Sequence, residues 1–131
     1  MELAQRAVNE ILSNSNLHKL ITEKDLAAFQ IENPKFVMGD IASGDQFFAS
    51  HVQKEQLTSV LPEVLCVEME GAAVAQVCFE YGIPFVVIRT ISDTADDQSH
   101  VDFVAFIKKI SSKYSAAIIS SIFELLAKEN I

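Results

Sequence analysis

The order of apolar and polar positions predicts alternating helices and strands. Apolar residues at helical spacing, together with capping residues such as Ser50, indicate helices. These helices are expected at residues 2–12, 51–60, 71–81 and 101–128. Apolar runs bounded by polar or turn residues predict strands at residues 36–43, 64–68 and 85–91. Because the two kinds of element alternate, the strands are expected to be parallel and joined by crossover helices.

Local signals refine several of these boundaries. Residues 17–30 are ambiguous, although Thr22 is a suitable cap for a short helix. Residues 39–40 (Gly-Asp) predict a bulge or a turn inside the first strand. Gly82 is well placed to end the third helix, because glycine accepts the left-handed conformation found after helices. A kink is expected in the last helix near residues 111–112, where two serines follow each other.

The predicted sheet looks incomplete. Only three strands are clear, whereas a doubly wound domain usually has about five or more. We therefore expect an incomplete three-layer α/β/α fold, with the C-terminal portion of a sheet followed by a long helix. Acidic residues stand where two of the strands end, at Glu68 to Glu70 and at Asp93. Ligands of open α/β sheets bind outside the carboxyl ends of the strands, so this edge is the expected site.

Composition narrows the class of protein. The chain has 131 residues, enough for one domain, and half of them are hydrophobic. Its formal net charge is −8 and it has no dense basic cluster, which argues against nucleic-acid binding. Cys66 and Cys78 lie in apolar runs without CxxC spacing, so two reduced, buried thiols are expected.

Several other classes find no support in the sequence. Residues 1–2 (Met-Glu) do not begin a secretory signal, and no apolar run approaches the roughly 20 residues of a membrane span. A cytoplasmic protein without a membrane partner is expected. The four glycines form no dinucleotide-binding or phosphate-binding motif, and no metal-ligand spacing is present. No cofactor and no metal are therefore predicted.

Two carboxylates near the end of the second strand are candidate ligand-binding groups. Glu68 and Glu70 are two residues apart, and Glu70 is expected near a helix N-terminus, where the dipole favours a carboxylate. A carboxylate there can accept hydrogen bonds from a vicinal diol such as that of a ribose. An acidic first helical turn that binds no ligand explains the same pattern, and the spacing does not decide between them.

Asp93 and two aromatic residues are further candidates. An aspartate at the end of a buried strand can have its pKa raised by burial and act as a general acid. A simple turn over residues 93–96 also explains Asp93, and taken alone Asp93 favours the turn. Phe47 and Phe48 follow the first strand, where a ring can stack on a planar base or cover the edge of the core.

Four segments together resemble the nucleoside phosphorylase/nucleosidase superfamily. They are SGDQF, VEMEGAA, PFVVIR and ISDTAD, at residues 43–47, 67–73, 84–89 and 91–96. Within that superfamily they are most similar to the 5′-methylthioadenosine/S-adenosylhomocysteine nucleosidases. The likeness extends from about residue 36 to the C-terminus. It implies a phosphorylase/hydrolase-like fold and hydrolysis of the N-glycosidic bond to release adenine, in methionine salvage.

The resemblance also implies roles for residues that would bind the nucleoside. Phe47 would stack on the adenine, and the backbone of Phe48 would bond to the edge of the base. Met69 would lie against the ribose, and Glu70 would hold the ribose hydroxyls. Phe103 would line the pocket for the 5′-alkylthio group.

The resemblance assigns the proton transfer to the end of the third strand. Asp93 would protonate N7 of the adenine, and Ser92 would orient Asp93. Arg89 and Glu68 would form a supporting ion pair. Protonation of the base matters because cleavage leaves negative charge on it, and a general acid typically accelerates such a step by about 100- to 10,000-fold.

The chain also departs from the family in length. Members are nearly twice as long, and their N-terminal half carries the glutamate that helps to activate water. The chain therefore looks like the C-terminal half, inactive or impaired alone, and expected to self-associate or to pair with the missing portion. Two alternatives stay open, namely a purine nucleoside phosphorylase of the same superfamily and a non-catalytic nucleoside-binding fragment.

Overall fold

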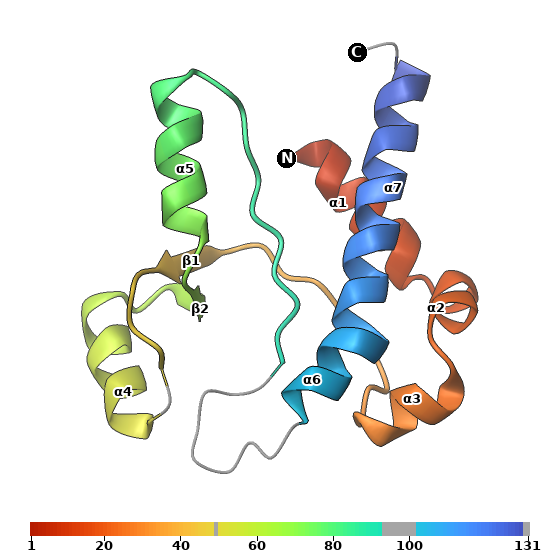
Figure 1. Ribbon diagram of the computed structural model, residues 1–131, viewed down its shortest axis with the longest axis horizontal. Coiled ribbons are helices and arrows are strands. Elements are labelled where there is room, and N and C mark those ends of the chain that lie inside the picture. Colours follow the sequence, from red (N-terminus) through yellow and green to blue (C-terminus); the bar gives the residue numbers. More distant parts are fainter. Residues whose placement is uncertain (49, 93–101, 130–131) are drawn as a thin grey trace. The chain divides into compact units, whose positions relative to one another are not determined.

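The computed structural model describes residues 1–48, 50–92 and 102–129. They divide into two compact units (Figure 1). One unit is helical and combines residues 1–36 with the C-terminal segment from residue 101. The other unit, residues 37–100, contains the sheet. The protein is thus mixed α/β, with a small parallel sheet and a long C-terminal helix, as the sequence predicts.

The helical unit is built on α1 (Glu2–Leu12), α2 (Asn14–Leu20) and α3 (Glu23–Ala28). The prediction for α1 is confirmed, and the ambiguous residues 17–30 hold the end of α2 and all of α3. Thr22 caps α3 as expected, because its hydroxyl accepts a hydrogen bond from the amide of Asp25 at 3.2 Å. Arg6 of α1 forms an ion pair with Glu129 near the end of the chain.

The C-terminal helix has an irregular second turn. It begins as α6 (Phe103–Phe106), continues as the π-helical turn η1 (Ile107–Ser111) and ends as α7 (Ser112–Glu129). The change to α7 falls between the two serines, at the position of the predicted kink. The Ser112 hydroxyl donates to the carbonyl of Lys108 at 3.1 Å, a bond that competes with regular helix geometry.

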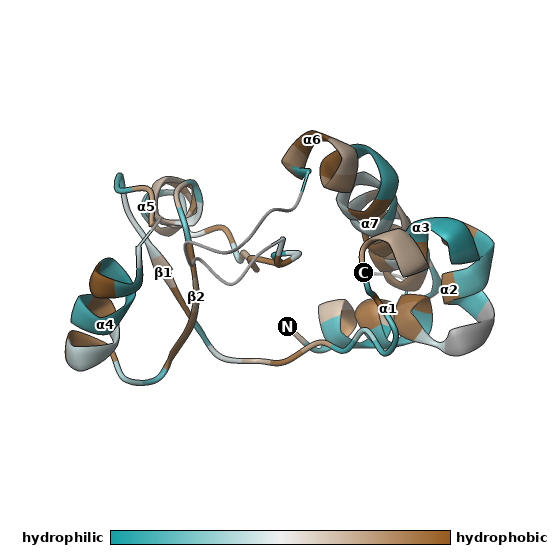
Figure 2. Cartoon of the chain, turned by 90° about the horizontal axis from the view of Figure 1, so that it is seen from below, coloured by the Kyte–Doolittle hydropathy of each residue, from teal (hydrophilic) through white to brown (hydrophobic). Residues whose placement is uncertain are grey.

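The apolar core lies in the helical unit. α1 and α7 lie side by side in it (Figure 1). Phe106 meets Phe29 edge to face, with ring centroids 5.6 Å apart. The buried core residues are Ala7, Val8, Leu17, Ile21, Leu26, Phe106, Ile110, Tyr114 and Ile118. Apolar residues of the C-terminal helix also remain exposed, notably on α6, which is brown in Figure 2.

The sheet unit consists of β1 (Asp40–Ser43), α4 (His51–Val60), β2 (Val64–Glu68) and α5 (Gly71–Glu80). The predicted helix 51–60 and strand 64–68 are confirmed. The strands are parallel neighbours, and their register is irregular between Asp40 and Ile41, next to the predicted bulge. Gly82 follows the C-cap residue of α5 and has φ of +61°. The amide of Ile83 donates to the carbonyl of Cys78, as expected for a helix that ends at a glycine.

Two predictions about the strands are wrong. β1 begins only at Asp40, so residues 36–39 lie outside the ladder. Residues 85–91, predicted as the third strand, carry no strand in the structure. Their apolar residues Phe85, Val86, Ile88 and Ile91 are exposed. A strand needs a neighbour for its backbone groups as well as an apolar sequence, and the described sheet has only β1 and β2.

The sheet unit has little core of its own. Among its described residues only Glu68 and Gly71 are buried, and neither is apolar. Cys66 and Cys78 are free, as predicted, but only half-buried. Within the described residues, no helix combines the length and the apolar character needed to cross a membrane.

Candidate functional site

The carboxyl ends of β1 and β2 lie together because the two strands are parallel. Ser43, the last residue of β1, is the register partner of Glu68, the last residue of β2. The backbone pairing continues one residue further, where the amide of Gly44 donates to the carbonyl of Glu68 at 3.2 Å. Two segments therefore begin side by side, namely the loop after Ser43 and the turn after Glu68. This is the edge of the sheet that the sequence predicts as the site.

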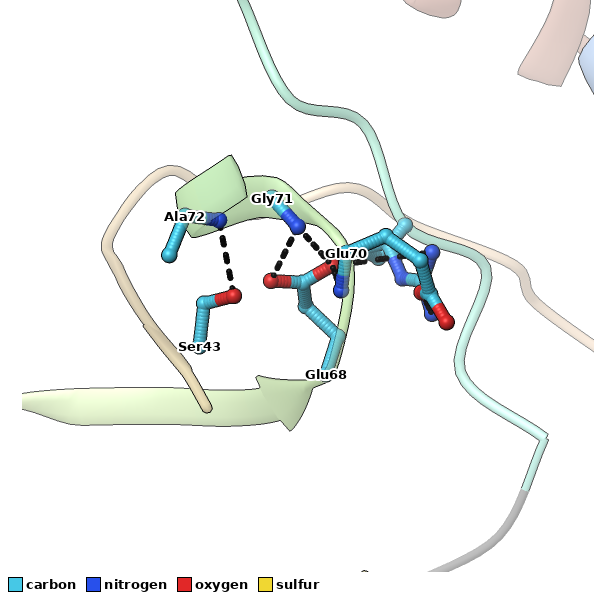
Figure 3. A network of polar contacts seen from close by, with 6 residues as sticks. Ser43, Glu68, Glu70, Gly71 and Ala72 are labelled. Atoms are coloured by element: carbon cyan, nitrogen blue, oxygen red, sulfur yellow. Dashed lines mark hydrogen bonds and ion pairs between the residues drawn. The ribbon is translucent and has the colours of Figure 1, made fainter. Parts of the chain in front are cut away.

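Glu68 is a buried carboxylate that binds the start of α5. Its side chain is 1% exposed. It accepts hydrogen bonds from the amide of Glu70 at 3.1 Å and from the amide of Gly71 at 2.9 and 2.8 Å (Figure 3). These amides have no partner within the helix, and the dipole at a helix N-terminus favours the negative charge. Glu68 therefore shapes the turn that carries Met69 and Glu70.

The hydroxyl of Ser43 connects the two strand ends with α5. It accepts a hydrogen bond from the amide of Ala72 at 2.8 Å (Figure 3). Its interaction with the carboxylate of Glu68 is the largest cause that lowers the pKa of Glu68. The amides of Gly71 and Glu70 and the charge of Arg89 lower that pKa further, against the opposing effect of burial. Glu68 thus stays ionised at pH values somewhat below its ordinary pKa.

Arg89 faces both glutamates. One guanidinium nitrogen lies 3.2 Å from a carboxylate oxygen of Glu70, and another lies 3.8 Å from Glu68. The predicted partner of Arg89 was Glu68, yet Glu70 is the nearer one. Because the Glu70 side chain is 68% exposed, its carboxylate is accessible to a ligand while Arg89 limits its orientation. The segment 85–91 thus contributes to the site although it forms no strand.

The predicted base-binding loop follows β1. Phe47 is 74% exposed and Phe48 is half-buried. The carbonyl of Phe47 accepts a bond from the side-chain amide of Gln53 at 3.4 Å, which ties the loop to α4. Met69 is 42% exposed in the turn before α5. Aromatic and thioether surfaces are thus available for apolar contact near this edge of the sheet.

Three other residues were predicted for the site. Asp93, the predicted acid, lies outside the described residues, as do residues 94–101. Ser92 is the last residue described before that gap. Phe103 is 59% exposed on α6, in the helical unit. The structure therefore brings Glu68, Glu70 and Arg89 into contact, and Phe47, Phe48 and Met69 belong to the same sheet unit.

Comparison with known proteins identifies the family. The model of the phosphorylase superfamily matches residues 3–124. The chain belongs to the phosphorylase superfamily. The match begins well before residue 36, where the predicted likeness starts, so it also includes the N-terminal helices.

Two curated relatives of this superfamily member carry the same name. The chain is 37% identical over 112 residues to the 5′-methylthioadenosine/S-adenosylhomocysteine nucleosidase of Shewanella oneidensis. The alignment covers 86% of this chain and 47% of that protein. The chain is also 37% identical over 107 residues to the enzyme of the same name from Geobacillus thermodenitrificans, covering 82% and 45%. The chain spans about half the length of the curated relatives it matches. No solved structure matches it significantly.

Sequence reasoning did not assign a role to Ser43. The signal was present, because Ser43 begins the SGDQF segment and ends a predicted strand. Its partner Ala72, however, is 29 positions away, and such a contact cannot be read from local spacing.

Other parts of this phosphorylase-superfamily chain offer less chemistry. No cluster of three or more potential metal ligands occurs among the described residues. A hollow of about 570 Å³ lies in the helical unit, lined among others by Leu17, Glu23 and Gln30. None of the predicted site residues lines it. The carboxyl ends of β1 and β2 in the sheet unit therefore remain the candidate site.

Proposed function

We propose that this chain carries the base-binding and sugar-binding side of a nucleosidase site. The reaction would be hydrolysis of the N-glycosidic bond of 5′-methylthioadenosine or S-adenosylhomocysteine, giving adenine and the 5′-thioribose product, as in methionine salvage. The observation that carries the proposal is the exposed Glu70 carboxylate, which is paired with Arg89 and follows the end of β2. The names of the relatives support this choice of substrate.

In this proposal each exposed group at the sheet edge contacts one part of the substrate. Phe47 stacks on the adenine, and the backbone of Phe48 bonds to its edge. Met69 lies against the ribose, while Glu70 accepts hydrogen bonds from the two ribose hydroxyls. A carboxylate near the sugar also favours the positive charge that develops on the ribose as the bond breaks.

The departing base needs a proton. Asp93 acts as the general acid at N7 of the adenine, and Ser92 orients it. Phe103 contacts the 5′-alkylthio group. These three assignments rest on the resemblance to the nucleosidases. Protonation neutralises the negative charge left on the base and so makes it a better leaving group.

Turnover in this proposal needs a further polypeptide segment. The sheet unit exposes large apolar side chains, including Leu65, Val74, Phe79 and Phe85, and the match covers less than half of each relative. A segment equivalent to the remaining part of the superfamily domain would cover such surface and supply the water-activating group. The native mass of the purified chain tests this against self-association, because a homo-oligomer indicates that second copies provide the cover.

Adenine release from 5′-methylthioadenosine is the direct test of the function. The wild-type chain is compared with Asp93→Asn and with a control, Asp97→Asn, which changes another aspartate four positions along the sequence. Release that is slow, independent of phosphate and lost only in Asp93→Asn supports the nucleosidase. Release that requires phosphate instead supports a phosphorylase, and binding of adenine without any release supports a non-catalytic fragment.

Two further outcomes are decisive. Turnover by the isolated chain at rates ordinary for enzymes, ~1 s⁻¹ or more, contradicts the need for another segment but leaves the nucleosidase proposal standing. Failure of the chain to bind either adenine or 5′-methylthioadenosine contradicts the proposed function itself.

A further inference from the structure

We propose that Ser43 is a positioning residue that sets the spacing between the base-binding loop and the sugar-binding turn. The inference rests on the proposed function, because it assigns these two segments to the two parts of a nucleoside. Ser43 ends β1 directly before the loop that carries Phe47. Its register partner Glu68 ends β2 directly before the turn that carries Glu70.

The hydroxyl of Ser43 makes two contacts at once. It accepts a hydrogen bond from the amide of Ala72 at 2.8 Å (Figure 3), and its interaction with the carboxylate of Glu68 lowers the pKa of that group. A hydroxyl has one proton and two lone pairs, so it can donate to the carboxylate while it accepts from the amide. One side chain of β1 therefore contacts both the end of β2 and the first turn of α5.

Glu68 extends this link to the sugar-binding turn. Its carboxylate is bonded to the amides of Glu70 and Gly71, and its other neighbour is Arg89, which also contacts Glu70. A change at Ser43 therefore reaches Glu70 both through the backbone and through Arg89. None of these residues except Glu70 is assigned a direct contact with the sugar.

The binding affinity of a nucleoside should depend on this spacing more strongly than that of a free base. The glycosidic bond fixes the distance between base and ribose, so both subsites must be correctly separated to bind the two parts together. Small misplacements are costly when two groups must be engaged simultaneously. Adenine alone uses only the Phe47 loop and does not depend on the separation.

The test compares Ser43→Ala with Ser43→Thr, which keeps the hydroxyl, and with a control, Ser59→Ala. Ser59 lies on exposed α4, and its hydroxyl donates to the carbonyl of Gln56 at 2.7 Å, within the same helix. Calorimetry measures the dissociation constants of 5′-methylthioadenosine and of adenine. We expect Ser43→Ala to weaken nucleoside binding about 5- to 10-fold, and adenine binding less than about 2-fold, as for loss of one or two hydrogen bonds. Ser43→Thr should restore most of the affinity, and Ser59→Ala should change neither.

A second measurement does not depend on any nucleoside. Amide hydrogen exchange at Ala72 should become faster in Ser43→Ala and stay slow in Ser43→Thr and Ser59→Ala. Should Ser43→Ala fail to fold, Ser43→Cys serves in its place, because a thiol is close in size and forms only weak hydrogen bonds.

The outcomes separate the two proposals. Equal losses of nucleoside and adenine affinity in Ser43→Ala, or unchanged exchange at Ala72, overturn the positioning role while the nucleosidase proposal stands. A wild-type chain that binds neither compound overturns the proposed function and the positioning role with it, even when the exchange at Ala72 responds.

Discussion

The carboxylate of Glu68 receives the backbone amide of Gly71 on both of its oxygens, at 2.9 and 2.8 Å. No cap of α5 comes from the side chain of its own N-cap residue, Glu70. A residue of the preceding strand therefore caps the helix, and the exposed carboxylate of Glu70 remains accessible to a ligand. Glu68 thus stabilises the start of the helix, while Glu70, two residues later, remains accessible to the proposed ligand.

Replacement of Glu68 by glutamine should destabilise the sheet unit. The glutamine side chain would keep one acceptor oxygen but lose the charge and place an amide group near the N–H donors of Glu70 and Gly71. Hydrogen bonds to charged groups contribute more than neutral ones, so we expect a loss of about 1–3 kcal/mol in the free energy of unfolding. Urea unfolding followed by circular dichroism measures it. Glu63→Gln, at an exposed position before β2, should change stability by less than about 0.5 kcal/mol.

The free energy of unfolding should also decrease as the pH is lowered, because Glu68 becomes protonated. Its pKa is lowered in the folded chain, chiefly by the hydrogen bond from Ser43, below the ordinary value of 4.5. The unfolded chain then binds the proton more readily, so the contribution is fully present above the ordinary pKa and is lost as pH falls through the folded one. Wild type and Glu68→Gln should therefore differ in unfolding free energy near about pH 7 and converge near about pH 2. A difference that stays constant over this range would contradict the role of the charge.

Local sequence signals predicted the elements of the sheet unit well where they were strong. Ser50 identified the start of α4, and its hydroxyl accepts from the amide of Gln53 at 3.4 Å. Gly82 indicated the end of α5, and in the structure it has the positive φ expected there. β2 was predicted with its observed bounds, Val64–Glu68. These features depend on neighbours within a few residues, which the sequence displays directly.

Features that depend on distant neighbours were not predictable. The apolar run 85–91 has the composition of a strand, but membership of a sheet requires a partner that composition does not specify. The same holds for the contacts of Arg89, which was expected at Glu68 and lies nearer to Glu70. The link from Ser43 to Ala72 joins β1 to α5 across an intervening helix and strand. The residues of the candidate site could therefore be named from motifs, whereas their bonding pattern could not be predicted.

Arg89→Lys should weaken nucleoside binding without much loss of stability. A guanidinium can face two carboxylates with separate nitrogens, whereas a lysine ammonium is a single point charge. Glu70 would lose its fixed orientation, and we expect the affinity for 5′-methylthioadenosine to fall roughly 3- to 10-fold while adenine binding is unchanged. Because the Arg89 side chain is 39% exposed, the unfolding free energy should change by less than about 1 kcal/mol.

The control for Arg89 is Arg6→Lys, which alters another partly exposed pair, with Glu129, in the helical unit. It should leave both dissociation constants unchanged. Equal weakening by the two substitutions would contradict a specific role for Arg89.

Phe47→Leu should weaken the binding of adenine itself. The ring is 74% exposed, so its loss should leave the fold intact while removing a surface on which a base can stack. Aromatic stacking contributes about 0.5–1.5 kcal/mol beyond the area buried, which corresponds to about a 2- to 10-fold loss of affinity. Phe79→Leu is the matched control, because Phe79 is 84% exposed on α5. A Phe47→Leu variant that binds adenine as tightly as the wild type would contradict the stacking role.

Tyr114→Phe should stabilise the helical unit. The Tyr114 hydroxyl is buried in the core and, among the described side chains, has no hydrogen-bond partner; burial also raises its pKa. An unsatisfied buried polar group costs about 1–3 kcal/mol, so removing the hydroxyl while keeping the ring should raise the free energy of unfolding by about 1 kcal/mol. Tyr81→Phe provides the control, because Tyr81 is 76% exposed and its hydroxyl can bond to water in either state. Thermal and urea unfolding of both variants give the comparison. A Tyr114→Phe variant that is less stable than the wild type would mean that the hydroxyl has a partner in the folded protein, and the core around α7 would then have to be reinterpreted.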